Sequence, residues 1–172
     1  GNSLLDIVNN ILDISKIETG KAVLMEKEYK VILFDFTGHG ESEGNDYDVT
    51  LFKSTKDLKN VVENTIGKDE KVNFLVFSYG AAVLANYLEN ENYVNANRVV
   101  MYSPCLFPLE SCFLNKDSLF GKDIVEAYEN GSLFRDGFTV VGAKNFKFSS
   151  KMIEECKNLK LKRLFTTLLS VS

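Results

Sequence analysis

The sequence predicts an α/β protein built around a parallel β-sheet. Through the middle of the chain, short apolar runs of strand length alternate with segments whose apolar residues recur every three or four positions. This alternation is typical of parallel strands joined by helical crossovers. The chain has 172 residues, of which 45% are apolar. It can therefore bury one hydrophobic core, and it corresponds to one domain or to one domain with a short appendage.

The first expected element is a helix that ends near Gly20. It carries two adjacent apolar seams, and a stripe of that width is typical of a helix buried in a bundle. The seams consist of Leu4, Ile7, Ile11 and Ile14, and of Leu5, Val8 and Leu12.

From residue 31 onward the expected order is strand, helix, strand, helix, strand. Continuous apolar runs indicate strands that are covered on both faces, and turn residues or small residues follow each run. The expected strands are residues 31–36, 74–77 and 98–102, and the expected helices are residues 54–66, with Ser54 and Asp57 in capping-box spacing, and residues 79–88.

The stretch from residue 106 to residue 148 is expected to be irregular. It should contain a short strand at 138–141 and a turn at residues 130–132, which read Asn-Gly-Ser. Met152, Cys156 and Leu159 then indicate a final helix with a basic surface.

Composition excludes several classes of protein. A net charge of -4 argues against a nucleic-acid binder. The apolar runs are too short to span a bilayer, and no basic segment precedes the first of them, so we expect a cytoplasmic protein without membrane contact. Cys105, Cys112 and Cys156 have no CxxC spacing and only one histidine beside them. We therefore expect no disulfide framework, no zinc site and no cofactor, with Cys105 and Cys112 packed as buried side chains.

A serine stands where a buried strand should give way to a helix. Residues 76–80 read Val-Phe-Ser-Tyr-Gly. A serine on such a sharp turn exposes its hydroxyl above the sheet, and the backbone N–H of the next residue, Tyr79, can help to bind an oxyanion. The positive end of the helix dipole lies at the same place. Ser78 is therefore a candidate nucleophile, and the alternative is an ordinary N-cap serine of a packed helix.

A second motif precedes this serine, and together the two resemble the α/β-hydrolase family. Residues 34–44 read Phe-Asp-Phe-Thr-Gly-His-Gly-Glu-Ser-Glu-Gly, which is similar to the family's strand end D-x-x-G-H-G-x-S. The resemblance covers about residues 29–159 in part. It implies a truncated three-layer sandwich with a parallel sheet, with residues 1–28 as a separate segment, residues 29–172 as the partial hydrolase domain and residues 106–150 as a cap-like insertion.

The resemblance also assigns roles to individual residues. Ser78 matches the nucleophile, and the backbone N–H of Tyr79 matches one oxyanion donor. The positions that match a turn at the rim of the site, outside the catalytic triad, are Asp35, Gly38, His39, Gly40 and Ser42.

The chain departs from the family in its backbone motif and in its strands. Val76 replaces the first glycine of the family's G-x-S-x-G, and a β-branched side chain there should strain the turn or push the helix away. The family strand that should lie between the strands matching 31–36 and 74–77 has no counterpart. Those two strands must therefore pair directly or leave a defect.

The chain also lacks the family's proton-transfer groups. The only histidine, His39, precedes Ser78, whereas the family places its acid and its histidine after the serine. Asp123, Glu126 and Asp136 follow Ser78 but are expected to be surface carboxylates. We therefore expect a serine hydrolase of esterase, lipase or thioesterase type, acting on an acyl ester or thioester, with weak or absent activity. The alternative is a non-catalytic interaction protein or a dimerisation module related to sensor kinases.

The N-terminal segment resembles a different family. Residues 3–21 read Ser-Leu-Leu-Asp-Ile-Val-Asn-Asn-Ile-Leu-Asp-Ile-Ser-Lys-Ile-Glu-Thr-Gly-Lys, which is similar to the second helix of the dimerisation and phosphoacceptor domain of sensor histidine kinases. The resemblance implies a homodimer through this helix but no kinase chemistry, because the helix that carries the phosphoacceptor histidine has no counterpart. The alternative is a helix that folds back onto its own sheet. The combination resembles a junction of two unrelated partial domains near residues 25–29. A natural fusion, an engineered joining and misjoined coding sequence would each produce such a junction.

Overall fold

The structure is a computed structural model that describes residues 30–67, 69–90, 96–142 and 145–159. The chain divides into two compact units, Gly1–Leu33 and Phe34–Ser172. The helices and strands of the described residues all belong to the second unit. The helix expected at residues 3–21 lies outside the described residues.

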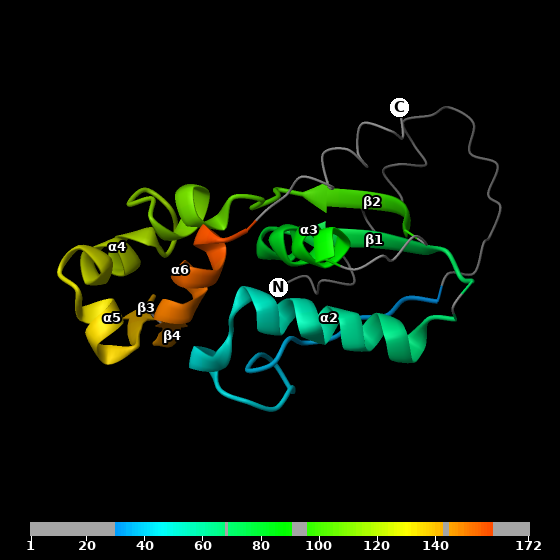
Figure 1. The fold of residues 1–172 in the computed structure, drawn as a ribbon, viewed down its shortest axis with the longest axis horizontal. Coiled ribbons are helices and arrows are strands. Elements are labelled where there is room, and N and C mark those ends of the chain that lie inside the picture. Colours follow the sequence, from blue (N-terminus) through cyan, green and yellow to red (C-terminus); the bar gives the residue numbers. More distant parts are fainter. Residues whose placement is uncertain (1–29, 68, 91–95, 143–144, 160–172) are drawn as a thin grey trace. The chain divides into compact units, whose positions relative to one another are not determined.

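A parallel pair of strands with a connecting helix forms the centre of the second unit (Figure 1). Strand β1 (Val72–Phe77) leads into helix α3 (Tyr79–Asn90), and strand β2 (Ala96–Tyr102) returns parallel to β1. In the register, Phe74 lies opposite Val99 and Phe77 lies opposite Tyr102. The strands expected at 74–77 and 98–102 and the helix between them are confirmed.

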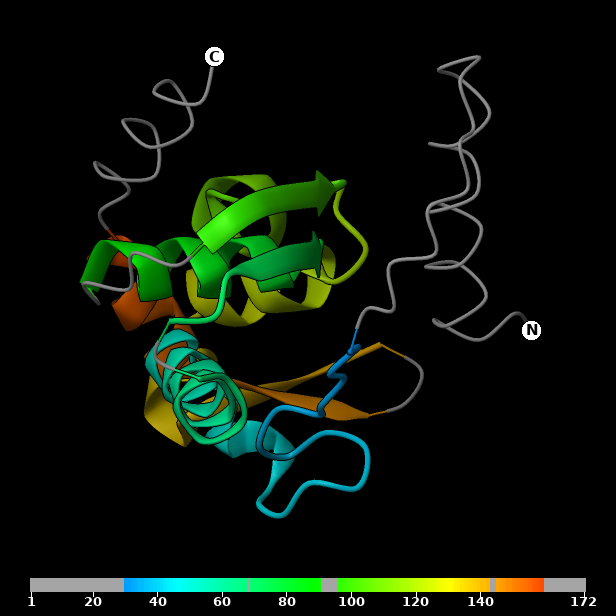
Figure 2. The ribbon, with the colours of Figure 1, turned by 90° about the vertical axis from the view of Figure 1, so that its right-hand side faces the viewer.

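Small side chains allow α3 to be buried on several sides at once. Residues 81–87 are all buried, and Leu84 is completely inaccessible. Helix α2 (Leu51–Thr65) packs against α3, while α3 lies along one face of the β1–β2 pair (Figure 2). Three of these seven residues are alanines, and small side chains allow neighbouring elements to pack close to a helix.

Helix α2 begins one turn earlier than the sequence predicts. Thr50 is the N-cap, and its hydroxyl accepts a hydrogen bond from the Lys53 N–H at 3.3 Å. The predicted cap at Ser54 is wrong, because Leu51 is fully buried and extends the apolar face by a turn. Ser54 is itself 1% exposed inside the helix.

The strand expected at 31–36 is not formed. Residues 30–36 belong to neither a helix nor a strand, and within the described part of the chain β1 pairs only with β2. A lone extended segment cannot satisfy its backbone groups in a ladder. Residues 31–36 therefore do not pair with β1. The missing family strand leaves a defect in the sheet, which is the second of the two expected outcomes.

The described residues of the second unit do not form the complete three layers expected of the sandwich. Helix α3 covers one face of β1 and β2. On the other face, apolar side chains of both strands are exposed, among them Leu75 and Val100. Within the described residues the sheet is therefore covered on one side only.

The region after β2 is more regular than the sequence indicates. It contains a single π-helical turn and several short elements that lie beyond the carboxyl ends of β1 and β2 (Figure 1). These elements are η2 (Leu109–Phe113), α4 (Gly121–Glu129), α5 (Ser132–Asp136), the antiparallel pair β3 (Phe138–Val141) and β4 (Phe146–Ser149), and α6 (Ser150–Lys157). The strand at 138–141 and the turn at Gly131, which has φ +77°, are confirmed.

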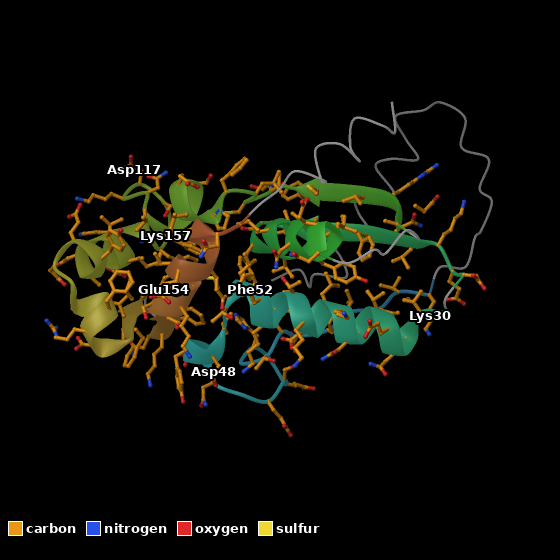
Figure 3. The ribbon with its side chains drawn as sticks, viewed as in Figure 1. Lys30, Asp48, Phe52, Asp117, Glu154 and Lys157 are labelled. Atoms are coloured by element: carbon orange, nitrogen blue, oxygen red, sulfur yellow. A yellow bond between two sulfur atoms is a disulfide. The ribbon has the colours of Figure 1, made fainter. Side chains whose placement is uncertain are left out.

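Helix α6 joins this region to α2. The Phe52 N–H, near the start of α2, donates a hydrogen bond to the Glu155 carboxylate at 2.8 Å. Figure 3 shows Phe52 together with Glu154, which precedes Glu155 on α6. None of the helices in the described residues combines the length and the apolar character needed to cross a membrane.

Candidate active site

Ser78 lies at the turn between β1 and α3, as the sequence predicts. Its backbone has φ +46°, in the left-handed region that costs a residue with a side chain roughly 1–2 kcal/mol. Strand β1 ends at Phe77 and α3 begins at Tyr79, so Ser78 alone makes the turn. A strained serine between a strand and a helix is the backbone arrangement of a nucleophile elbow.

Long-range backbone hydrogen bonds hold this turn. The Ser78 N–H donates to the Tyr102 carbonyl at 3.1 Å. The Ser78 carbonyl accepts from the N–H groups of Ala81 and Cys105, each at 3.0 Å. The turn is therefore fixed both by the start of α3 and by the segment that follows β2.

The first N–H groups of α3 lie next to the Ser78 hydroxyl in the chain. The N–H groups in the first turn of a helix have no intrahelical partner, and the helix dipole places positive potential there. The Tyr79 N–H is one of these groups. A negative charge that develops beside Ser78 would meet donors that the fold already orients.

The Tyr79 side chain serves packing. Its hydroxyl donates to Ser54 Oγ at 3.3 Å and lies 3.8 Å from Met152 Sδ. Burial, more than any other cause, raises the pKa of the Tyr79 hydroxyl above its ordinary value. Tyr79 thus anchors the start of α3 to α2 and α6 and keeps its phenol neutral.

The expected displacement of α3 by Val76 is not observed. Val76 pairs with Met101 in the β1–β2 ladder, and α3 begins at Tyr79, two residues after the end of β1. A Cβ built on Gly80 would lie 3.8 Å from the Val76 Cβ, which is ordinary contact. The expectation that Val76 pushes the helix away is wrong, because Gly80 leaves room beside it.

The glycine-rich turn after residue 34 is held mainly by its own groups. The Glu41 N–H donates to the Asp35 carboxylate at 3.1 Å, and the Ser42 hydroxyl donates to the Asp35 carbonyl at 2.6 Å. Gly40 has φ +50°, and a Cβ there would overlap the Asp35 carboxylate. One bond ties the turn to α2, from the Thr37 N–H to the Asp57 carboxylate at 2.9 Å.

No described side chain hydrogen-bonds the Ser78 hydroxyl. His39 is exposed, and its ring lies 3.5 Å from the Thr37 carbonyl and packs against Phe146. Asp123 accepts from the Gly142 N–H at 3.1 Å, and Asp136 pairs with Arg135 at 3.0 Å. The structure therefore brings neither His39 nor any of the three expected surface carboxylates, Asp123, Glu126 and Asp136, to the Ser78 hydroxyl.

The cysteines differ from the prediction. Cys105 and Cys112 form a disulfide, contrary to the expectation that they pack as separate side chains. The turn η2 folds the intervening segment back, with the Ser111 N–H donating to the Phe107 carbonyl at 2.9 Å. Cys156 is free and buried, and burial raises its pKa from 9.0 to about 12.

Two surface hollows lie away from Ser78. One of about 540 Å³ lies between η1 (Asp46–Asp48) and the start of α6, and it mixes three lysines with three carboxylates. The other, of about 480 Å³, lies between α2 and α3. In the part of the chain that the structure describes, no group of three or more His, Cys, Asp or Glu side chains could hold a metal ion.

A comparison with protein families identifies the family of the chain. The chain matches the family model described as serine aminopeptidase S33 over residues 15–166. The match covers most of the chain, so the chain belongs to this family, which is part of the α/β-hydrolase superfamily. The fold is therefore of the α/β-hydrolase type, and the protein is a hydrolase of that type. A search of curated proteins found none that matches the chain.

Sequence reasoning missed the groups that support the site from a distance. The Tyr102 carbonyl and the Cys105 N–H hold the turn at Ser78, and the Asp57 carboxylate holds the turn after residue 34. Backbone partners carry no sequence signal. The spacing of Asp57 from Ser54 predicts a role in capping α2, whereas its carboxylate binds the Thr37 N–H.

Proposed function

We propose that this chain is a serine hydrolase whose nucleophile is Ser78 and whose substrates are acyl esters or thioesters. The observation that carries the proposal is the backbone of Ser78, a non-glycine residue at φ +46° between β1 and α3. A fold retains such strain where surrounding contacts impose it, and these positions cluster at active sites.

The chemistry proceeds in two steps. The Ser78 oxygen bonds to the acyl carbon, the negative charge that develops on the carbonyl oxygen is stabilised by the Tyr79 N–H, and the bond to the alcohol or thiol breaks. The serine proton leaves to solvent, and the departing group is protonated. Water then attacks the acyl-enzyme, releases the acid and restores the hydroxyl.

The rate should be low. Among the described residues no base accepts a hydrogen bond from Ser78 Oγ, and serine enzymes that lose their base are slowed by several orders of magnitude. What remains is oxyanion stabilisation and binding. The proposal is therefore a slow hydrolase that prefers activated acyl groups.

The test is hydrolysis of p-nitrophenyl butyrate by the full chain, compared with Ser78→Ala and Ser103→Ala. Ser103 is a matched control because it also has positive φ, +45°, at the end of a strand. The wild-type chain and Ser103→Ala should turn over the ester at equal rates, and Ser78→Ala should fall to the rate without protein. Equal rates in all three proteins would remove Ser78 from the reaction.

A second function, association, is favoured by the exposed apolar side chains on the open face of β1 and β2. A homodimer through the helix expected at residues 3–21 belongs to the same proposal. Ile11→Asp should abolish the dimer in analytical ultracentrifugation while Ser78→Ala leaves it intact, because a charge in an apolar seam is costly to bury. A monomeric wild-type chain would contradict this second function.

A further inference from the structure

The surface hollow of about 540 Å³, here called the lysine hollow, lies between segments from distant parts of the second unit. Its walls are the stretch from η1 to the start of α2, the junction of α5 with β3, and the junction of β4 with α6. Asp48 lies on the first wall (Figure 3). The Lys147 N–H donates to the Asp46 carboxylate, and the Ser150 N–H donates to the Gly137 carbonyl, both at 2.9 Å. These hydrogen bonds join the walls and fix the shape of the hollow.

Three lysines, Lys53, Lys147 and Lys151, line the hollow. Among the described residues, none of their ammonium groups forms an ion pair with a carboxylate. The Lys147 ammonium lies over two aromatic rings of the same hollow, 5.7 Å from the centroid of Tyr47 and 5.3 Å from that of Phe138. The hollow therefore presents positive charge that is available to an anion.

The three carboxylates of the hollow have hydrogen-bond donors of their own. Asp136 accepts two bonds from the Arg135 guanidinium, each at 3.0 Å. Glu155 accepts from the Phe52 N–H at 2.8 Å, and Asp48 accepts from a side-chain amide at 3.4 Å. The negative groups are thus engaged with other partners, whereas the lysines are not.

Two buried hydroxyl groups also line the hollow. Thr50 caps α2 and Ser149 caps α6, and these residues are only 7% and 5% exposed. Each hydroxyl oxygen accepts a capping bond at 3.3 Å, from the N–H of Lys53 and of Lys151 respectively. Within the described parts of the chain, neither hydroxyl proton has an acceptor, and a buried donor without an acceptor is costly. An anion in the hollow would supply that acceptor beside the positive ends of two helix dipoles.

We propose that the lysine hollow binds a small-molecule phosphate monoester. Its phosphate oxygens accept hydrogen bonds from the three lysines and from the hydroxyls of Thr50 and Ser149. A phosphate monoester presents three terminal oxygens and about two negative charges, and so matches this set of donors better than a carboxylate does. Tyr47 and Phe138, which are 42% and 37% exposed, provide an apolar surface for the organic group. The volume of the hollow lies within the range of small-molecule sites, roughly 300–1,000 Å³.

The test is a titration of the full chain with phenyl phosphate, followed by ³¹P NMR, and the same titration with inorganic phosphate. Lys53→Gln and Lys151→Gln should each weaken the binding of phenyl phosphate at least about tenfold, because each removes a charge-assisted hydrogen bond. Lys122→Gln is the matched control, since Lys122 is exposed on α4 outside the hollow and the change in net charge is the same. Ser78→Ala should bind phenyl phosphate as tightly as the wild-type chain, so this site is measured independently of the hydrolysis proposed above.

The outcomes separate the alternatives. Saturable binding that is weakened in Lys53→Gln and Lys151→Gln but unchanged in Lys122→Gln supports the proposal, provided that inorganic phosphate binds more weakly than the ester. Equal affinity for the two anions would assign the hollow to free phosphate and overturn the choice of an ester. Equal weakening in all three lysine variants would show a diffuse effect of charge and overturn the site. It would also be overturned by folded protein that shows no saturable binding up to about 10 mM, where a site of millimolar affinity would be mostly occupied.

Discussion

A serine follows each of the two neighbouring parallel strands, and the two serines have nearly the same φ angle but different surroundings. Ser78 follows β1 with φ +46°, and Ser103 follows β2 with φ +45°. Ser78 is half-buried and leads directly into α3, whereas Ser103 is exposed and leads into Pro104. The Cys105 N–H joins the two turns by donating to the Ser78 carbonyl.

The comparison shows that a positive φ at a strand end is shared by the proposed nucleophile and by a second serine. What distinguishes Ser78 is the helix that begins at the next residue and places the positive end of its dipole beside the serine. The chemistry proposed for Ser78 should therefore depend on α3, and Ser103 provides an internal control for backbone strain alone.

The largest expected effect comes from loosening α3. Leu84→Ala should lower the free energy of unfolding by about 2–5 kcal/mol, because Leu84 is fully buried in the hydrophobic core and the substitution leaves a cavity. Leu119→Ala, at a residue that is 87% exposed, should change it by less than about 0.5 kcal/mol. Urea unfolding at neutral pH measures both. Equal losses would mean that α3 does not support the turn at Ser78 through its core contacts.

A smaller effect concerns the hydrogen bond from the Tyr79 hydroxyl to Ser54, next to Ser78. The residue after Ser103 is Pro104, whose side chain cannot form such a bond. Tyr79→Phe should cost about 1 kcal/mol at neutral pH, because the buried Ser54 hydroxyl loses its partner. The folded state raises the Tyr79 pKa above 10.0. The wild-type protein should therefore keep this contribution below pH 10 and lose it as the pH rises further.

The same variant checks the sign of that effect. Urea unfolding measured from pH 7 to pH 11 should show a shallower alkaline loss in Tyr79→Phe than in the wild-type protein. Some loss should persist, beginning near pH 9, because burial also raises the pKa of Cys156 from 9.0 to about 12. An unchanged alkaline slope in Tyr79→Phe would show that this hydroxyl is not held in its neutral form by burial.

The smallest effect isolates backbone strain. Ser78→Gly and Ser103→Gly should each stabilise the fold by about 0.5 kcal/mol relative to the corresponding alanine variants, because glycine adopts positive φ without a steric cost. Thermal unfolding of the four variants measures this difference. Destabilisation by glycine at Ser78 alone would indicate that the serine side chain contributes a contact that offsets the strain.

The sequence predicted the parts of the fold that local patterns encode. The strands around Phe74 and Val99, the helix after Ser78 and the turn at Gly131 all carry a short-range signal of periodicity or glycine. The segment at 31–36 carried the same apolar signal and yet forms no strand, since a strand also needs a partner, and pairing is a property of the tertiary fold. Helix α4 was missed because it begins at Gly121, a residue that usually marks a helix end.

The candidate site was likewise predictable where a local sequence motif marks it. Ser78 carries a recognisable motif and lies where that motif places it, between β1 and α3. The glycine-rich turn also carries a motif, but the strand that should precede it does not form. The support for Ser78 comes from the Tyr102 carbonyl and the Cys105 N–H, which are backbone groups present at every position. No pattern of side chains could have identified them, and the disulfide partner of Cys105 was likewise set by the fold of η2.

The most direct test of the account is labelling of the full chain with a fluorophosphonate probe, followed by mass mapping of the modified residue. Such a probe needs an activated serine rather than an exposed one. We predict slow but complete labelling at Ser78, none at Ser103, and loss of the label in Ser78→Ala. Labelling at both serines to the same extent, or no labelling of folded protein over many hours, would contradict the claim that the turn between β1 and α3 activates Ser78.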